Sequence, residues 1–179
     1  MREPKVTIRY AKSLIGLAIE LNKLEEVHAD MLLLKNLCND SKELSLFLKS
    51  PIVKSDIKLS LLNQIFSSSV SELTMAFIVL LTKKKREYFL RDISIDFSNL
   101  YNKEKNITPV ILTTAFKIDD NLRNDIMIFL KKQGAENIKL EEKVDESIIG
   151  GAVIKMGDKQ LDTSVSSKIK LLKQSFNKN

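Results

Sequence analysis

The stretch "NKEKNITPVILTTAF", residues 102–116, marks a change in the character of this 179-residue sequence. Before it, apolar residues recur mainly at spacings of three and four. From Ile107 onward, a run rich in β-branched residues carries no helical period. β-Branched side chains favour strands because they pack well on a pleated surface. The stretch therefore predicts a boundary between a helical domain, residues 1–105, and a different domain, residues 106–179.

Upstream of this boundary, the spacing of apolar residues predicts six helices. Stripes one helical turn apart define the first two helices, with members Val6, Tyr10, Leu14, Leu17 and Leu21, and then Leu24, Val27, Met31, Leu34 and Cys38. Ala11 and Ala18 flank the first stripe, and such small residues allow a second helix to approach closely. This face is therefore suited to helix–helix contact, either inside the domain or with a partner.

The remaining four helices are separated by proline and serine signals. A short helix over 42–49 ends before Pro51, because proline disfavours the α conformation in the residue ahead of it. Ser55-Asp56 is expected to cap a helix that runs to Phe66, and Ser69 or Ser71 the next. That helix, around "LTMAFIVLL" at 73–81, is apolar nearly all round, which predicts burial on several sides at the centre of the bundle. An amphipathic helix around 89–101 completes the bundle.

Downstream of the boundary, the order of predicted elements is strand, helix, strand, strand, helix. The helix starts with aspartates, places Leu122, Ile126 and Phe129 on one face and stops at Gly134. A strand over 148–156 meets a tight turn at Gly157-Asp158 and returns through Leu161. Asp162, Thr163 or Ser164 then caps a last helix, whose apolar face is Val165, Ile169, Leu172 and Phe176. The predicted fold is mostly α: a six-helix bundle followed by a small α/β (α+β) domain.

Charge and cysteine content narrow the functional classes. The net charge of +6 would suit binding to nucleic acid, to an anionic membrane surface or to an acidic protein. Because basic and acidic residues are both spread along the chain, the nucleic-acid hypothesis is weakened. The single cysteine, Cys38, excludes an intrachain disulfide and fits a reducing compartment. No window reaches about 18 apolar residues, so we expect a cytosolic protein that touches a membrane only through partners.

The sequence features that could indicate a phosphate, partner or metal site are explained more simply by their structural roles. Gly150-Gly151 precedes an apolar strand rather than a helix, so it predicts a bulge or close backbone packing and not a phosphate cradle. The lysines in "KKKRE", residues 83–87, suit a helix C-terminus, with a partner-binding role left open. His28, the only histidine, has no companion that would complete a metal site or a catalytic triad. We therefore expect no catalytic residue, no cofactor and no metal.

Several motifs together resemble the delta subunit of the F-type ATP synthase, the family of the mitochondrial oligomycin-sensitivity-conferring protein. The start "RYAKSLIGLAIE" is similar to the family's opening helix, and "FLKSPIVKSDIKLSLLNQIF" to its proline-marked section. "FIVLLTKKKREYFLRDISIDFSNLY" matches its helix–arginine–helix section at Arg86. The most specific match is "LEEKVDESIIGGAVIKMGDKQLDTSV", in which a Gly-Gly pair, an aliphatic strand and a Gly-Asp turn lead to the last helix.

This resemblance implies a noncatalytic peripheral-stalk (stator) subunit of the proton-translocating ATP synthase. The helical domain would bind the N-terminal segment of an alpha subunit in a groove between its first and fifth helices. The matching positions in this sequence are Tyr10, Ala11, Leu14, Ala18, Phe77, Ile78 and Leu81. The C-terminal domain would contact the b-type stalk subunits. The implied location is peripheral, at the cytoplasmic face of the bacterial inner membrane, with membrane contact only through the complex and no nucleic-acid partner.

Two alternatives remain from the residues alone. A basic helical protein can bind nucleic acid, and its affinity would then fall steeply with salt. An enzyme with a pair of catalytic carboxylates has no signature in one sequence, because aspartates and glutamates are abundant on any soluble surface.

Overall fold

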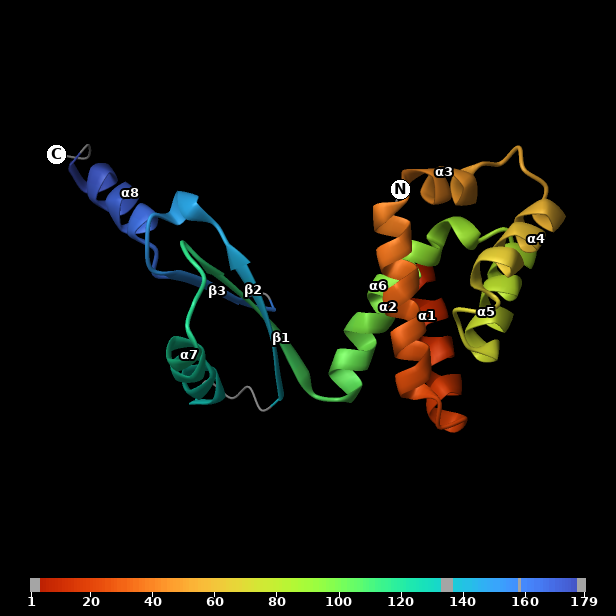
Figure 1. The fold of residues 1–179 in the computed structure, drawn as a ribbon, viewed down its shortest axis with the longest axis horizontal. Helices are drawn as coiled ribbons and strands as arrows, with labels where there is room; N and C mark the ends of the chain where they lie inside the picture. Colours follow the sequence, from red (N-terminus) through yellow and green to blue (C-terminus); the bar gives the residue numbers. More distant parts are fainter. Residues whose placement is uncertain (1–3, 133–136, 158, 177–179) are drawn as a thin grey trace. The chain divides into compact units, whose positions relative to one another are not determined.

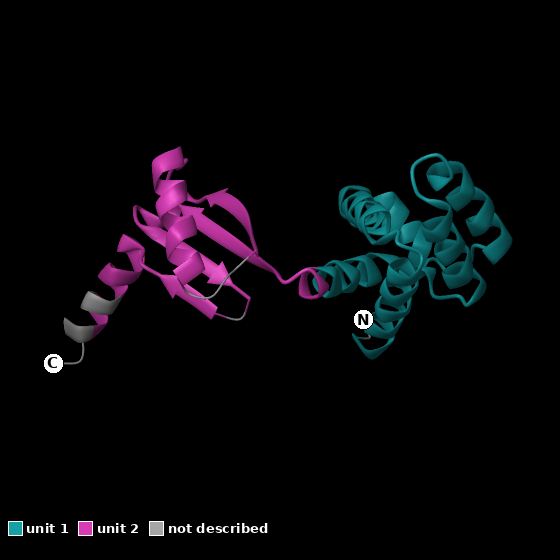
Figure 2. Ribbon diagram, turned by 90° about the horizontal axis from the view of Figure 1, so that it is seen from below, with its two compact units in different colours: residues 1–101 teal, residues 102–179 magenta. Residues whose placement is uncertain are grey.

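The computed structural model describes residues 4–132, 137–157 and 159–176, and the chain divides into two compact units, residues 1–101 and 102–179 (Figure 2). The first unit is built from helices, and the second carries a four-stranded sheet with helices (Figure 1). The predicted fold class, a helical N-terminal region followed by a small α/β domain, is confirmed.

The helical unit contains the six predicted helices within the described residues. In chain order they are α1 (Pro4–Glu20), α2 (Leu24–Asp40), α3 (Lys42–Lys49), α4 (Ser55–Phe66), α5 (Glu72–Lys83) and, after the short 3₁₀ turn η1 (Glu87–Phe89), α6 (Leu90–Glu104). The end of α6, residues 102–104, groups with the second unit.

Ser41 caps α3 and Ser71 caps α5, whereas the predicted cap of α4 is wrong. Ser71 caps α5: its Oγ accepts a hydrogen bond from the Thr74 amide over 3.3 Å. Asp30 of α2 in turn accepts hydrogen bonds from the Ser71 amide and hydroxyl, over 2.9 and 2.6 Å. Ser55, by contrast, is already the first residue of α4, so it lies inside the helix, and Lys54 occupies the cap position without a side-chain bond.

The lysines 83–85 lie where α5 ends. Lys83 is its last residue, Lys84 is the C-cap, and Lys85 has a positive φ of 55°. The amide of Arg86 bonds back to the Leu81 carbonyl over 2.8 Å, the pattern of a Schellman motif. The three lysine side chains are exposed, as expected for cations that complement the negative end of a helix.

The buried face of α1 differs from the predicted stripe. Thr7, Ala11, Leu14 and Ala18 are buried, whereas Leu17 and Leu21 are 41% and 49% exposed. The small residues turn inward because the neighbouring helices lie close to α1, and the larger apolar side chains are displaced to its flank. Of the predicted stripe only Leu14 is buried, together with the flanking Ala11 and Ala18.

Helix α5 is also less enclosed than its composition predicts. Phe77, Ile78 and Leu81 are buried, but Ala76 is exposed and Leu80 is 45% exposed. One side of this apolar helix is thus left open by the rest of the unit, while the side that carries Phe77, Ile78 and Leu81 is buried.

The second unit is a mixed sheet with helices. Its elements are β1 (Ile107–Thr114), α7 (Asp120–Lys132), β2 (Asn137–Val144), the 3₁₀ turn η2 (Glu146–Ile148), β3 (Ala152–Met156), β4 (Lys159–Asp162) and α8 (Val165–Phe176). The strand order is β2-β1-β3-β4, with β1 and β2 parallel and the other pairs antiparallel. Val110 and Leu112 of the central strand β1 are fully buried.

Some sequence expectations shift in this unit. The strand expected from residue 148 begins only at Ala152, because η2 and the glycine pair precede it. The residue of α7 that is buried is Leu130, whereas Leu122 and Phe129 of the predicted face are about 40% exposed. Gly134 and Asp158 lie outside the described residues, as do the side chains of Leu172 and Phe176.

The glycine pair serves the backbone. Gly151 has a φ of +79°, and a Cβ on it would lie 2.6 Å from the Thr163 carbonyl oxygen. Close backbone packing is therefore confirmed, since only glycine combines this φ with this approach. The start of α8 is held there by Ser164, whose Oγ accepts from the Ser167 amide over 3.2 Å, and by Asp162, which accepts from the Ser164 amide over 2.9 Å.

Candidate functional site

An apolar groove runs between α1 and α5 of the helical unit. Its walls are Tyr10, Ser13, Leu14 and Leu17 from α1, and Leu73, Ala76, Phe77 and Leu80 from α5. Seven of these eight side chains are aromatic or aliphatic, and the Ser13 hydroxyl donates to the Arg9 carbonyl of its own helix over 3.0 Å. The groove, called here the α1/α5 groove, offers a mainly apolar surface.

An aromatic pair joins the two walls of the α1/α5 groove. The rings of Tyr10 and Phe77 meet edge to face, with centroids 6.4 Å apart and planes at 69°. Such pairs are favourable beyond their buried area. The guanidinium of Arg9 lies 5.8 Å from the Tyr10 ring centroid, close enough for a cation–π contact. Leu17 and Leu80 remain more than two-fifths exposed on the walls, so the groove has unburied apolar surface to offer.

The structure divides the seven predicted contact residues into two sets. Tyr10, Leu14 and Phe77 line the α1/α5 groove. The other four lie in the core beneath it, with exposed fractions of 0 or 1%: Ala11, Ala18, Ile78 and Leu81. Those four hold α1 and α5 in place, and their side chains do not reach a bound partner in this conformation.

Five lining residues were absent from the predicted set: Ser13, Leu17, Leu73, Ala76 and Leu80. A signal for three of them was present in the sequence, since Leu17 belongs to the apolar stripe of the first helix, and Leu73 and Leu80 belong to a segment apolar on every side. An apolar excess of this kind indicates either core or interface, and periodicity alone does not separate the two.

The second unit carries its own apolar surface between α7 and the sheet, called here the C-terminal cleft. Its main apolar side chains are Phe116, Leu122, Ile126, Phe129, Ile154 and Leu161. Phe116 is 66% exposed and Leu161 is 47% exposed. Because α7 buries so little of its own apolar face, the cleft is a second candidate for protein contact.

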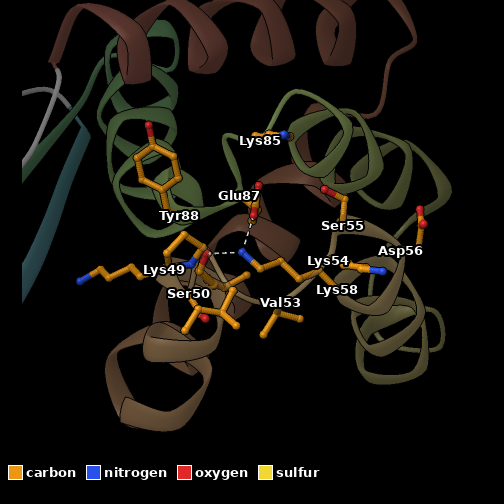
Figure 3. Close-up of a pocket in the computed structure, with 13 residues that line it drawn as sticks. Lys49, Ser50, Val53, Lys54, Ser55, Asp56, Lys58, Lys85, Glu87 and Tyr88 are labelled. Atoms are coloured by element: carbon orange, nitrogen blue, oxygen red, sulfur yellow. Dashed lines mark hydrogen bonds and ion pairs between the residues drawn. The ribbon is translucent and has the colours of Figure 1, made fainter.

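The polar pocket between α3, α4 and η1 has a structural explanation. Lys58 is 3% exposed, and its Nζ donates to the Leu48 carbonyl over 3.0 Å and to Glu87 Oε1 over 2.5 Å (Figure 3). The rim lysines Lys49 and Lys54 extend in opposite directions rather than converging (Figure 3). The central lysine is thus already paired, and the pocket presents no cradle for an anion.

The single histidine and the single cysteine lie in packed surroundings. The His28 ring stacks on Tyr101 with centroids 3.6 Å apart and planes at 5°. Burial raises the pKa of the Cys38 thiol to about 11, although the charge of Arg91 acts in the opposite direction. A thiol that stays protonated is a poor nucleophile and a poor metal ligand. Neither residue is therefore placed for chemistry.

The described residues show neither a metal-binding cluster nor a membrane-spanning helix. In the described ranges, no group of three or more His, Cys, Asp or Glu side chains is arranged to hold a metal ion. Within the same ranges, no helix has both the length and the apolar character needed to cross a bilayer.

Comparisons with known proteins agree over nearly the whole chain. Residues 6–176 match the sequence model of the family described as ATP synthase delta (OSCP) subunit. The chain is 38% identical to ATP synthase subunit delta of Cytophaga hutchinsonii, over 98% of this chain and 96% of that protein. The same-named protein of Chlorobaculum parvum is 35% identical over 94% of this chain and 93% of its own length. The fold of the present chain is similar to that of a chain in the Toxoplasma gondii mitochondrial ATP synthase hexamer, with a TM-score of 0.73 and 26% identity. The match covers 95% of this chain and 96% of that one.

Proposed function

Because the chain belongs to the ATP synthase delta (OSCP) subunit family, we propose that it is a noncatalytic subunit of the peripheral stalk. In this role it links the N-terminal segment of an alpha subunit, on the catalytic head, to the b-type stalk subunits. The observation that carries the proposal is the α1/α5 groove, whose lining is mainly apolar and includes the partly exposed Leu17 and Leu80.

The shape and chemistry of the α1/α5 groove support a helical partner. An apolar groove between two helices is a typical binding site for a third, amphipathic helix, which packs its apolar face into the groove. Leu17 and Leu80 supply the exposed apolar surface, and the Tyr10–Phe77 pair supplies an aromatic contact between the two walls. Aromatic side chains in such positions are frequent binding hot spots because they bury large area at small entropic cost.

The C-terminal cleft is the proposed contact for the b-type subunits. It lies in the unit that does not carry the α1/α5 groove, so one chain can hold two partners at once. The exposed Phe116 and Leu161 give this cleft an apolar anchor of the kind that protein interfaces use.

A stator needs tight association and no chemistry. It must keep the catalytic head still against the torque of the rotating shaft, and apolar docking at two ends meets that demand. The proposed location follows from this role: peripheral to the cytoplasmic face of a bacterial inner membrane, with contact to the lipid only through partner subunits. Family membership favours this reading over a nucleic-acid-binding protein or a carboxylate enzyme.

The test is a calorimetric titration of the full-length protein with a synthetic peptide of the alpha-subunit N-terminal segment from the same organism. We expect binding, and we expect Leu17→Ser and Leu80→Ser to weaken it about ten-fold or more, since each removes apolar surface from the interface. Leu46→Ser is the matched control, because Leu46 is 69% exposed on α3, away from the groove.

Three further outcomes bear on the proposal. No binding at about 100 μM peptide would overturn it. Equal loss in the Leu46 control would show that the effect is not specific to the groove. A steep fall of affinity with salt, together with binding of duplex DNA, would favour the nucleic-acid alternative.

A further inference from the structure

Helices α1 and α5 run in opposite directions along the α1/α5 groove. A turn of three residues, 21–23, joins α1 to α2, so α2 returns alongside α1. Asp30, in the second turn of α2, bonds to Ser71, the residue that caps the start of α5. From that start, α5 reaches Tyr10, in the N-terminal half of α1, with its Phe77 ring. The N-terminal end of α5 therefore lies toward the C-terminal end of α1.

This antiparallel arrangement places three cations toward one end of the groove. Helical spacing places Lys83 and Lys84 one turn beyond the lining residue Leu80, toward the N-terminal half of α1, where the guanidinium of Arg9 lies over the Tyr10 ring. All three cations are exposed. We call this the basic end.

The opposite end carries carboxylates. Glu20 lies one turn beyond the lining residue Leu17 on α1, and Glu72 lies one turn before the lining residue Ala76 on α5. Both glutamates are exposed. We call this the acidic end.

The two ends are far enough apart to act separately. Arg9 and Glu20, like Glu72 and Lys83, are separated by 11 residues of one helix, and that corresponds to about 17 Å along its axis. The Debye length at physiological salt is about 8 Å, so a charge at one end of the groove is screened from the other. A helix lying in the groove would therefore meet a positive field at one end and a negative field at the other.

We propose that this charge asymmetry fixes the direction in which a helix lies in the α1/α5 groove. The inference rests on the proposed docking function and adds the chemistry of the partner to it. The partner is an amphipathic helix that carries its acidic residues at the basic end, beside Lys83, Lys84 and Arg9. Its basic residues lie at the acidic end, beside Glu20 and Glu72. Like charges meet in the reversed orientation, so specificity comes from repulsion as well as attraction.

The proposal gives Lys83 and Lys84 a role in addition to the one at the helix end. As cations at the end of α5, they already complement the negative end of the helix dipole. A basic end that receives carboxylates of the partner adds a role in partner recognition.

The first experiment reverses charges in the full-length protein. Lys83→Glu/Lys84→Glu is titrated with the alpha-subunit N-terminal peptide beside Lys42→Glu/Lys49→Glu, which makes the same change in net charge on exposed positions of α3. We expect the first variant to bind about ten-fold more weakly than the second, with the difference lost in about 1 M salt. Equal affinity of the two variants would overturn the proposal.

The second experiment reads the direction itself. The same peptide carries a nitroxide label at either its N-terminal or its C-terminal end, and broadening of protein amide signals is followed by NMR. If the peptide binds in one fixed direction, each label broadens amide signals at only one end of the groove, either near Lys84 or near Glu20. The label on the more acidic end of the peptide should broaden the signals near Lys84. Broadening at both ends by each label would overturn the proposal. Failure of the unaltered protein to bind the peptide would instead overturn the docking function beneath it.

Discussion

Lys58 Nζ lies 2.5 Å from Glu87 Oε1, and both side chains are more than nine-tenths buried. The same ammonium donates to the Leu48 carbonyl over 3.0 Å, so one lysine connects the end of α3, the body of α4 and the turn η1 (Figure 3). The Leu48 contact joins residues 10 positions apart and the Glu87 contact residues 29 positions apart. The pair thus fixes how α3 and α4 pack on the rest of the helical unit.

Removing only one charge of the Lys58–Glu87 pair is expected to lower the free energy of unfolding strongly. Lys58→Met leaves the carboxylate of Glu87 buried and uncompensated, and we expect a loss of about 3–5 kcal/mol in the free energy of unfolding. Lys58→Met/Glu87→Leu removes both charges and should recover most of that loss. Urea unfolding at pH 7 measures both, with the exposed Lys42→Met as control. A double variant no more stable than the single one would contradict the coupling.

Two glycines with positive φ should respond differently to the same substitution. At Gly157 an added Cβ would meet no atom within 4 Å, but the φ of +57° is unfavourable for alanine. We therefore expect Gly157→Ala to lower the free energy of unfolding by about 1–2 kcal/mol. Gly151→Ala adds a Cβ that meets the Thr163 carbonyl oxygen at 2.6 Å, so we expect a loss above about 3 kcal/mol. The rate of hydrogen exchange at the Val110 and Leu112 amides of β1 measures the stability of the second unit in each variant. Equal losses at the two glycines would show that the close approach is relieved by a small shift.

Two alanines beside the α1/α5 groove separate its surface from its core. Ala18 is 0% exposed, so Ala18→Glu buries an unpaired charge and should destabilise the helical unit by more than about 3 kcal/mol. Ala76 is exposed on the groove wall, so Ala76→Glu should leave thermal unfolding almost unchanged and weaken only the binding of the alpha-subunit peptide. Circular dichroism melting and titration check the two variants. A stable Ala18→Glu protein would contradict the packing of α1.

Tyr101 should make stability depend on pH in the alkaline range. Its hydroxyl donates to Glu25 Oε2 over 2.5 Å, and this bond, with burial as the second cause, raises the pKa of Tyr101 from 10 to about 12. The folded state holds the proton more tightly, so the stabilisation is complete below about pH 10 and is lost as pH rises through about 12.

The comparison with Tyr101→Phe isolates this effect from other groups that titrate in the same range. The free energy of unfolding of the variant should fall less between about pH 10 and 12 than that of the unaltered protein. Ultraviolet titration of tyrosinate should also lose its latest step, since the chain has three tyrosines. Identical pH profiles for the two proteins would exclude the Tyr101–Glu25 bond as the cause.

Local signals in the sequence predicted most of the secondary structure because they act within a few residues. The break at Pro51, the cap at Ser71 and the β-branched run from Ile107 each act on their own backbone, whatever the rest of the chain does. The cap expected at Ser55 failed for a related reason. Several adjacent polar residues can start a helix, and tertiary packing selects among them.

The candidate site was predictable only in part. Of the seven predicted residues, Tyr10, Leu14 and Phe77 line the groove, whereas Ala11, Ala18, Ile78 and Leu81 lie in the core. The reason is geometric: neighbouring positions on a helix differ by about 100° in direction, and a stripe of apolar residues does not reveal which flank a neighbouring helix covers.

The sequence by itself determined the two-part organisation, the element order and the need for glycine near residue 151, because backbone propensity and turn chemistry are local properties. Only the tertiary structure decided which apolar residues stay open to a partner. Leu17 and Leu80 are apolar like the core residues Leu14 and Leu81, and they differ only in lying where no other helix of the unit covers them. Exposure is a property of the packed unit, so the groove between α1 and α5 exists only once both helices are in place.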